Sequence, residues 1–242
     1  MTPDTGHDGI FDVSDLRTFD IADDLAAALA AYVAEGIEAD LAARGAASLA
    51  VSGGRTPGRF FAALAARDLD WSRVVVTLVD ERWVPETSPR SNAALVRAGL
   101  LTGRAAAARF VPLHGGEPTP EEGMDALAAR LADLPLPFSA VVLGMGDDGH
   151  TASFFPGGDR LAEAIDADTD DLVSPMRAPG AGEPRITFTL PAILGARRLA
   201  LHIEGEGKRD VLARALSDDD ATEMPVRAVL GRAPAMPVFW CP

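Results

Sequence analysis

The chain has 242 residues, of which 48% are hydrophobic and 24% are charged, and its formal net charge is −14. This composition is typical of a globular protein with a sizeable core. The acidic balance argues against non-specific nucleic-acid binding, which requires a basic surface. A site for an anionic ligand must therefore be locally basic or built from backbone N–H groups.

The polar, acidic N-terminus does not resemble a secretory signal, and no apolar run is long enough to span a bilayer. A single cysteine, Cys241, excludes an intramolecular disulfide framework, and the sequence has no Cys/His cluster typical of a zinc site. We therefore expect a soluble cytoplasmic protein with no metal ion, no membrane partner and no nucleic-acid partner. The sequence predicts no particular oligomeric state.

Apolar residues recur at helical spacing in some segments and form short apolar runs in others. They predict helices over residues 21–44, 57–67, 92–101, 120–133 and 207–216. They predict strands over residues 48–51, 74–79, 109–113, 138–143, 185–190, 199–203 and 237–240. This alternation indicates an α/β fold, with a doubly wound, mainly parallel sheet and helices on both faces. We expect one domain over residues 1–242, with residues 1–10 as a flexible tail.

The most informative segment is the glycine-rich turn over residues 144–156, directly after the predicted strand at 138–143. It carries the carboxylate of Asp148 two residues before the imidazole of His150. Open α/β sheets bind ligands at such strand ends, and histidine exchanges protons near neutral pH. The pair predicts an acid–base site, with a purely structural histidine as the alternative. The glycines also match G-x-G-x-x-G, but the long helix that dinucleotide binding requires does not follow.

A second glycine-rich segment, Ser52-Gly53-Gly54-Arg55-Thr56-Pro57, joins a predicted strand to a predicted helix. Thr56 suits the helix cap, and Pro57 suits the first helical position. The two glycines leave backbone N–H groups exposed near the positive end of the helix dipole, which favours a phosphate group. The alternative is an ordinary strand-to-helix turn. The P-loop pattern is absent, so nucleoside triphosphates are not favoured.

Further charged residues lie next to other strands. Asp80-Glu81-Arg82 follows the strand at 74–79, and Arg82 suits a phosphate or carboxylate group, with an internal salt bridge as the alternative. Arg185 begins a strand and faces either the site or the solvent. Lys208 lies in the first turn of a helix, where the dipole disfavours a cation, so a ligand role is favoured. His202 is interpreted as a core or hydrogen-bonded strand residue.

Taken together and in this order, the motifs resemble those of the 6-phosphogluconolactonase family over nearly the whole chain. The matching segments are Ser52–Pro57, Asp80–Arg82, Ser91–Asn92, Gly144–Ser153, Pro184–Thr187 and Gly205–Lys208. The resemblance implies a fold like that of glucosamine-6-phosphate deaminase and ribose-5-phosphate isomerase. It also implies hydrolysis of 6-phospho-D-glucono-1,5-lactone in the oxidative pentose phosphate pathway, with no metal or organic cofactor. Arg55 departs from the family, in which a smaller serine is frequent at this position.

Hydrolysis of a lactone requires an activated water molecule, and we assign His150 as the general base. Asp148 is the second catalytic candidate, and it either orients His150 or positions the sugar hydroxyls. The small-molecule phosphosugar lactone would contact a larger set of residues. The candidate substrate-binding residues are Ser52, Gly53, Gly54, Arg55, Thr56, Asp80, Arg82, Asn92, Gly146, Arg185 and Lys208.

Two other functions remain as alternatives. The first is an aldose–ketose isomerase or deaminase acting on a hexose phosphate. The related deaminase carries a glutamate in an Ala-Phe-Asn-Glu-Pro context, whereas this chain reads Ser153-Phe154-Phe155-Pro156 after its histidine, which favours the lactonase. The second is a non-catalytic phosphosugar sensor, which would carry a DNA-binding helix-turn-helix module, and no basic segment of that kind is present.

Overall fold

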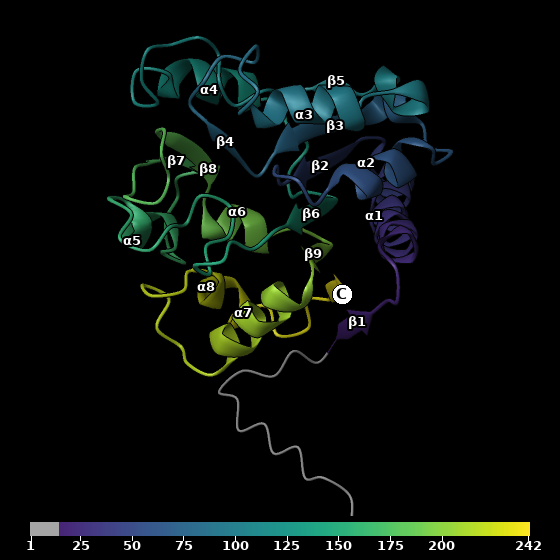
Figure 1. Cartoon of the computed structure of the whole chain (residues 1–242). Helices are drawn as coiled ribbons and strands as arrows, with labels where there is room; N and C mark the ends of the chain where they lie inside the picture. The colour runs from purple at the N-terminus through teal and green to yellow at the C-terminus, as the bar shows by residue number, and fades with distance from the viewer. Residues whose placement is uncertain (1–14) are drawn as a thin grey trace, which may run out of the picture.

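Seven parallel strands form the central sheet of the computed structural model, which describes residues 15–242. In spatial order they are β1 (Leu16–Thr18), β10 (Val238–Cys241), β9 (Leu199–Glu204), β6 (Ala140–Leu143), β2 (Ala47–Val51), β3 (Val74–Leu78) and β5 (Arg109–Phe110). Because β1 pairs with β10, both ends of the described chain belong to one sheet (Figure 1). The flexible tail expected at residues 1–10 lies outside the described residues.

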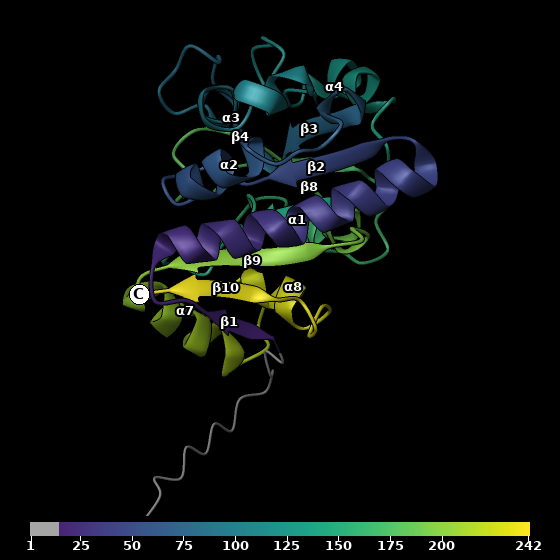
Figure 2. The ribbon, with the colours of Figure 1, turned by 90° about the vertical axis from the view of Figure 1, so that its right-hand side faces the viewer.

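Helices cover both faces of this sheet (Figures 1 and 2). The long helix α1 (Ala22–Arg44) lies along one face together with α2 (Gly58–Ala65), and α6 (Leu190–Leu194) lies on the other. The other helices are α3 (Asn92–Gly99), α4 (Met124–Leu131), α5 (Leu161–Ala164), α7 (Glu206–Leu216) and α8 (Val226–Leu230), with 3-10 turns at Trp71–Arg73 and Gly103–Ala107. The predicted doubly wound α/β fold with a mainly parallel sheet is confirmed.

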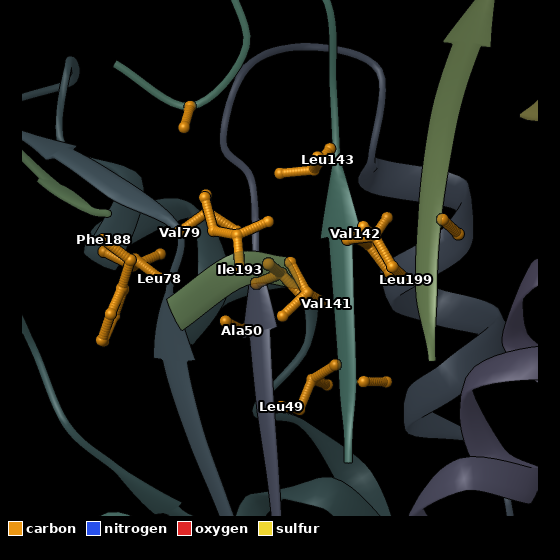
Figure 3. Packing of buried hydrophobic residues seen from close by; sticks show 14 of the residues in the cluster. Leu49, Ala50, Leu78, Val79, Val141, Val142, Leu143, Phe188, Ile193 and Leu199 are labelled. Carbon is orange, nitrogen blue, oxygen red and sulfur yellow. The ribbon is translucent and has the colours of Figure 1, made fainter. Parts of the chain in front are cut away.

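The central strands are buried along their whole length, since helices cover parallel sheets on both faces. Every residue of β2, β3 and β6 is buried. Figure 3 shows part of this core, with Leu49 on β2, Leu143 at the carboxyl end of β6 and Ile193 of α6 among the apolar side chains. This packing holds the carboxyl ends of the strands in fixed positions, and the loops that follow them start from a rigid base.

Three further strands form a separate antiparallel sheet, which the sequence did not predict. Its order is β4 (Asp80–Arg82), β8 (Arg185–Phe188) and β7 (Val173–Met176). The strand predicted at 185–190 is therefore real but does not belong to the parallel sheet, and its end is wrong because Leu190 begins α6. Pairing of β4 with β8 places Arg82 opposite Arg185, which brings two distant arginines to one place.

Two predicted helix starts are also wrong. The helix predicted from residue 120 begins at Met124. Thr119 Oγ1 accepts a hydrogen bond from the Glu122 N–H, as a capping box requires, but the residues between form a turn. The helix predicted from Pro57 begins at Gly58, and Pro57 rather than Thr56 is its cap residue, with no side-chain cap hydrogen bond. At Thr119 the cap hydrogen bond is present, but the chain turns once more before the helix begins.

The order of strands reverses between β2 and β6. From β2 the chain proceeds to β3 and β5 on one side, and it then returns through β6 to β9 and β10 on the other. Adjacent loops leave the sheet in opposite directions at such a point and open a crevice at the carboxyl edge, where ligands bind in open α/β sheets. The two loops that start here are the two glycine-rich segments of the sequence.

No helix within residues 15–242 is long and apolar enough to cross a membrane. The assignment of residues 1–242 to one domain stays a prediction.

Glu81 joins the small sheet to α3 through a buried carboxylate. Its side chain is fully buried and accepts four hydrogen bonds. Oε1 accepts from the backbone N–H groups of Arg82 and Asn92, and Oε2 accepts from the Ala93 N–H and the Ser91 hydroxyl. The carboxylate therefore satisfies N–H groups at the start of α3, where the helix dipole favours a negative charge.

Glu81→Gln should lower the free energy of unfolding by roughly 2–4 kcal/mol, because each oxygen accepts from a backbone N–H. Whichever way the new amide turns, its NH2 group faces a backbone donor. Urea denaturation measures the loss. Glu122→Gln, in an exposed turn, is the control and should change stability by less than about 0.5 kcal/mol. Equal stability of the two variants would contradict the role given to Glu81.

Candidate active site

A cavity of about 320 Å³ opens at the carboxyl edge of the sheet, where β2 and β6 meet. It brings together His150 and every candidate substrate-binding residue named from the sequence, and Asp148 is the one candidate that does not line it. The candidate residues that line it are Ser52, Gly53, Gly54, Arg55, Thr56, Asp80, Arg82, Asn92, Gly146, His150, Arg185 and Lys208. The fold thus gathers residues from six separate segments of the chain at one place.

His150 and Asp148 form a hydrogen-bonded pair in the turn after β6. The distance between His150 Nδ1 and Asp148 Oδ1 is 2.6 Å, and the same oxygen accepts from the His150 backbone N–H at 3.1 Å. The hydrogen bond from His150 lowers the pKa of Asp148 to about 2. Because Asp148 is ionised near neutral pH, the proton of a neutral His150 lies on Nδ1. Its Nε2 lone pair, without a hydrogen-bond partner among residues 15–242, is then free to accept a proton.

Gly146 gives this pair the space that it needs. A methyl group at residue 146 would lie 2.1 Å from His150 Nδ1 and 2.6 Å from Asp148 Oδ1. The backbone N–H of Gly146 donates to the His150 carbonyl, which closes the turn. Gly149, at a φ of 76°, supplies the left-handed conformation that lets the chain reverse between the two partners. The glycines in this motif therefore shape the His–Asp pair and do not open a dinucleotide-binding helix.

The second glycine-rich loop packs directly against the first. Ser52 Oγ accepts a hydrogen bond from the Gly144 N–H, so the loops after β2 and β6 are joined where they leave the sheet. A side chain at Gly53 would overlap Asn92, whose Oδ1 lies 1.9 Å from the position of a Cβ atom. Gly54 has a φ of 96° and open space beside it. This loop therefore requires glycine for close approach at one position and for backbone conformation at the next.

Two arginines from the small sheet lie at the cavity with incomplete hydrogen bonding. Arg185 is buried; it donates to the Ala181 carbonyl, and its Nη1 lies 3.8 Å from Asp80 Oδ2. Burial lowers the pKa of Arg185, and Asp80 opposes that change. Arg82 donates to the Arg90 carbonyl. Among the described residues, Nε of both arginines is buried without a partner, and a polar ligand would face these cations across the cavity.

Asp80 and Asn92 complete this wall. Asp80 Oδ2 accepts from the Ser153 hydroxyl at 2.6 Å, and the Asn92 side-chain N–H donates to the Asp80 carbonyl at 2.9 Å. Asn92 Oδ1 is buried and has no partner within the described part of the chain. Among the described residues, no ion pair joins two side chains of Asp80-Glu81-Arg82, which was the alternative for this segment; Asp80 instead lies 3.8 Å from Arg185. Glu81, the other acid of the motif, has a structural role.

Lys208 has an anionic partner inside the protein. Its Nζ lies 2.5 Å from Asp147 Oδ1, which lowers the pKa of Asp147. Asp147 is 91% exposed, whereas Lys208 lines the cavity, so the cation lies between solvent and site. The turn that carries His150 therefore supplies Asp147 as an anionic partner for Lys208 near the start of its helix.

Several side chains that line the cavity were not predicted from the sequence, among them Phe155, His202 and Glu204. Phe155 packs against the His150 ring with 4.3 Å between ring centroids. His202 and Glu204 on β9 form a second hydrogen-bonded pair, with 3.0 Å between Nε2 and Oε1, and burial of His202 agrees with its interpretation as a strand residue. No signal in the sequence identifies Phe155, while the alternate positions of His202 and Glu204 place both on one side of a strand ending at the site.

Residues 15–242 contain no group of three His, Cys, Asp or Glu side chains that could hold a metal ion.

This geometry is that of an α/β enzyme. A His–Asp pair and several cations lie where the strand order of its parallel sheet reverses. The family model described as glucosamine-6-phosphate isomerases/6-phosphogluconolactonase matches residues 20–240. The chain belongs to this family, and the resemblance recognised in its motifs is confirmed.

Curated relatives match the chain over most of its length. The 6-phosphogluconolactonase of Rhizobium meliloti (strain 1021) is 52% identical over 230 residues, which cover 95% of this chain and 99% of the relative. The 6-phosphogluconolactonase of Pseudomonas aeruginosa is 44% identical and covers 94% of each chain. Both matches span all the segments that line the cavity.

Solved structures give the same result for the fold. A crystal structure of a 6-phosphogluconolactonase from Shewanella baltica OS155 superposes with a TM-score of 0.93 at 41% identity, covering 97% of this chain and 100% of that one. A monomeric glucosamine-6-phosphate deaminase superposes with a TM-score of 0.72 at 16% identity, covering 94% of this chain and 96% of the other, which shows a shared fold.

Gly146→Ala should separate His150 from Asp148 and raise the Asp148 pKa from about 2 toward the ordinary value near 3.9. In the wild type, the ionised Asp148 carboxylate stabilises the folded protein fully when the pH is above the ordinary pKa of an aspartate. This stabilisation is lost as the pH falls through about 2. The variant should lose this contribution. Carbon NMR of the Asp148 carboxyl measures its titration.

The matched control is Gly144→Ala, in the same turn, where a new methyl group would have only Ser52 Cβ nearby, at 4.0 Å. It should leave the titration of Asp148 near pH 2. An unchanged Asp148 titration in Gly146→Ala would mean that the pair tolerates a side chain at this position.

Proposed function

We propose that the protein hydrolyses 6-phospho-D-glucono-1,5-lactone to 6-phospho-D-gluconate, as a carboxylic ester hydrolase of the oxidative pentose phosphate pathway in the cytoplasm. The relatives named above, at 44% and 52% identity, support the reaction class. The observation that carries the proposal is the His150–Asp148 pair, in which His150 lines a cavity that several cations also line.

In the proposed reaction, His150 Nε2 removes a proton from a water molecule as the water oxygen attacks the lactone carbonyl carbon. The carbonyl electron pair moves to its oxygen, which becomes the oxyanion of a tetrahedral intermediate. When this intermediate collapses, the bond from carbon to the ring oxygen breaks. The ring oxygen takes the proton from the imidazolium, so His150 returns to its neutral form and the product is an open-chain carboxylic acid.

Asp148 holds the imidazole in the required tautomer and stabilises the imidazolium that forms. The depressed pKa of Asp148 keeps it ionised throughout the cycle, so the carboxylate remains an acceptor for Nδ1–H. Of the two roles predicted for Asp148, the hydrogen bond supports the orientation of His150. The oxyanion would be stabilised either by backbone N–H groups of the glycine-rich turn or by an arginine side chain such as Arg185.

The phosphate group would bind at the other part of the cavity, on the Ser52–Thr56 loop. The two glycines expose backbone N–H groups there, and the first turn of α2 follows. Arg55, Arg82 and Lys208 line the same cavity and supply positive charge. Binding the phosphate away from the reacting carbon holds the carbonyl in place for attack by water.

His150→Asn should reduce kcat on the order of a hundredfold or more while the protein stays folded, because asparagine cannot remove the proton from water. The lactone assay must be corrected for spontaneous hydrolysis. His114→Asn is the control, since His114 packs against Trp83 outside the cavity and should keep kcat. Near-normal turnover by His150→Asn would rule out its assignment as the general base.

Lys208→Ala and Arg82→Ala should each raise KM for the phosphorylated lactone by about tenfold or more, because each removes a charge next to the phosphate. Both variants should hydrolyse unphosphorylated gluconolactone as efficiently as the wild type does. Arg104→Ala is the control, because Arg104 pairs with Asp68 away from the cavity. If the wild type hydrolyses both lactones with equal efficiency, the phosphate anchor does not exist.

A further inference from the structure

Phe155 contacts both His150 and Arg185, but the reaction proposed above gives it no role. The ring centroids of Phe155 and His150 are 4.3 Å apart, and their planes meet at 31°, which is a close, tilted contact. The Arg185 guanidinium carbon lies over the Phe155 ring at 5.2 Å from its centroid. Phe155 itself is 3% exposed and lines the cavity.

The backbone after His150 is shaped to return Phe155 to this position. Ala152 has a φ of 52°, an uncommon left-handed conformation for a residue with a side chain. Thr151 and Phe154 then form an isolated antiparallel bridge, and the Phe154 N–H donates to the Thr151 carbonyl. The chain therefore turns back on itself within a few residues, so Phe155 faces the imidazole that precedes it.

The hydrogen bond to Asp148 does not by itself fix the imidazole plane. It holds Nδ1 near one oxygen but leaves the ring able to tilt about that contact. The Phe155 ring, packed against the imidazole with 4.3 Å between the two centroids, supplies the second constraint and thereby fixes the direction of Nε2. The negative face of the Phe155 ring also attracts the imidazolium that forms when His150 takes a proton.

We propose that Phe155 is a positioning residue for the reaction: its ring fixes the His150 plane so that Nε2 points at the attacking water. The inference rests on the proposed function, in which His150 is the base. Arg185 also contacts the ring but keeps two other partners, the Ala181 carbonyl and Asp80. Loss of the ring should therefore affect the proton-transfer step far more than substrate binding.

The test compares Phe155→Leu with the neighbouring core variant Phe154→Leu. Phe154 is fully buried, and within the described residues its ring contacts no other aromatic ring. Phe155→Leu should lower kcat by about tenfold and change KM by less than about threefold, because the base is misaligned while the binding groups remain. Phe154→Leu should keep kcat within about twofold of the wild type, even where it loses thermal stability.

Unfolding curves show whether each variant is folded at the assay temperature. If Phe155→Leu does not fold, Phe155→Met, which fills more of the space with a flexible apolar chain, takes its place with the same expected result. A folded Phe155 variant with wild-type kcat, or with a loss confined to KM, would overturn the inference. An equal loss of kcat in Phe154→Leu would do the same, since the effect would then be general to the core.

His150→Asn, measured in parallel, separates this inference from the proposed function. If His150→Asn is inactive and Phe155→Leu retains full kcat, the positioning role fails while the proposed base stands. If His150→Asn is itself fully active, the assignment of His150 as the general base fails and the inference fails with it, although hydrolysis of the lactone stands.

Discussion

The reversal of strand order between β2 and β6 is the constraint on which the site depends. Because all neighbouring strands of the central sheet are parallel, their carboxyl ends share one edge, and the loops after β2 and β6 diverge there. The hydrogen bond from the Gly144 N–H to Ser52 Oγ joins these loops at their base. One loop then supplies Gly53 and Gly54 to the cavity, and the other supplies a histidine that is hydrogen-bonded to a carboxylate. The sheet thus sets the distance between the Ser52–Thr56 loop and His150.

In a protein with a net charge of −14, the cavity is lined by four cations, Arg55, Arg82, Arg185 and Lys208, while nearby acids are held by partners within the protein. Glu81 is occupied by hydrogen-bond donors of its own sheet and helix, and Asp148 is occupied by His150. Asp147 is turned to solvent with Lys208 as its partner. The side chains that remain directed at the cavity include Arg82 and Arg185, each with a buried nitrogen that lacks a partner in the described structure. Under the proposed function, this distribution would let an acidic chain accept an anionic sugar.

Much of this arrangement could be predicted from the sequence, because its causes are local. The apolar strand at 74–79 and the glycine-rich turns after two strands place polar groups at strand ends, and parallel strands bring those ends together. The antiparallel pairing of β4 with β8 could not be predicted, since three- and four-residue strands acquire their partners only through tertiary packing. The contact of Phe155 with His150 depends on the positive φ of Ala152, for which the sequence carries no marker.

The most direct test is the reaction itself, measured on the purified protein with the substrate of the lactonase and with the substrate of the related deaminase. With 6-phospho-D-glucono-1,5-lactone, we predict acid release well above the spontaneous rate. With glucosamine 6-phosphate we predict no ammonia, because residues 151–158 contain no carboxylate that could move protons during ring opening. Ammonia release at an efficiency comparable to that of lactone hydrolysis would contradict the account.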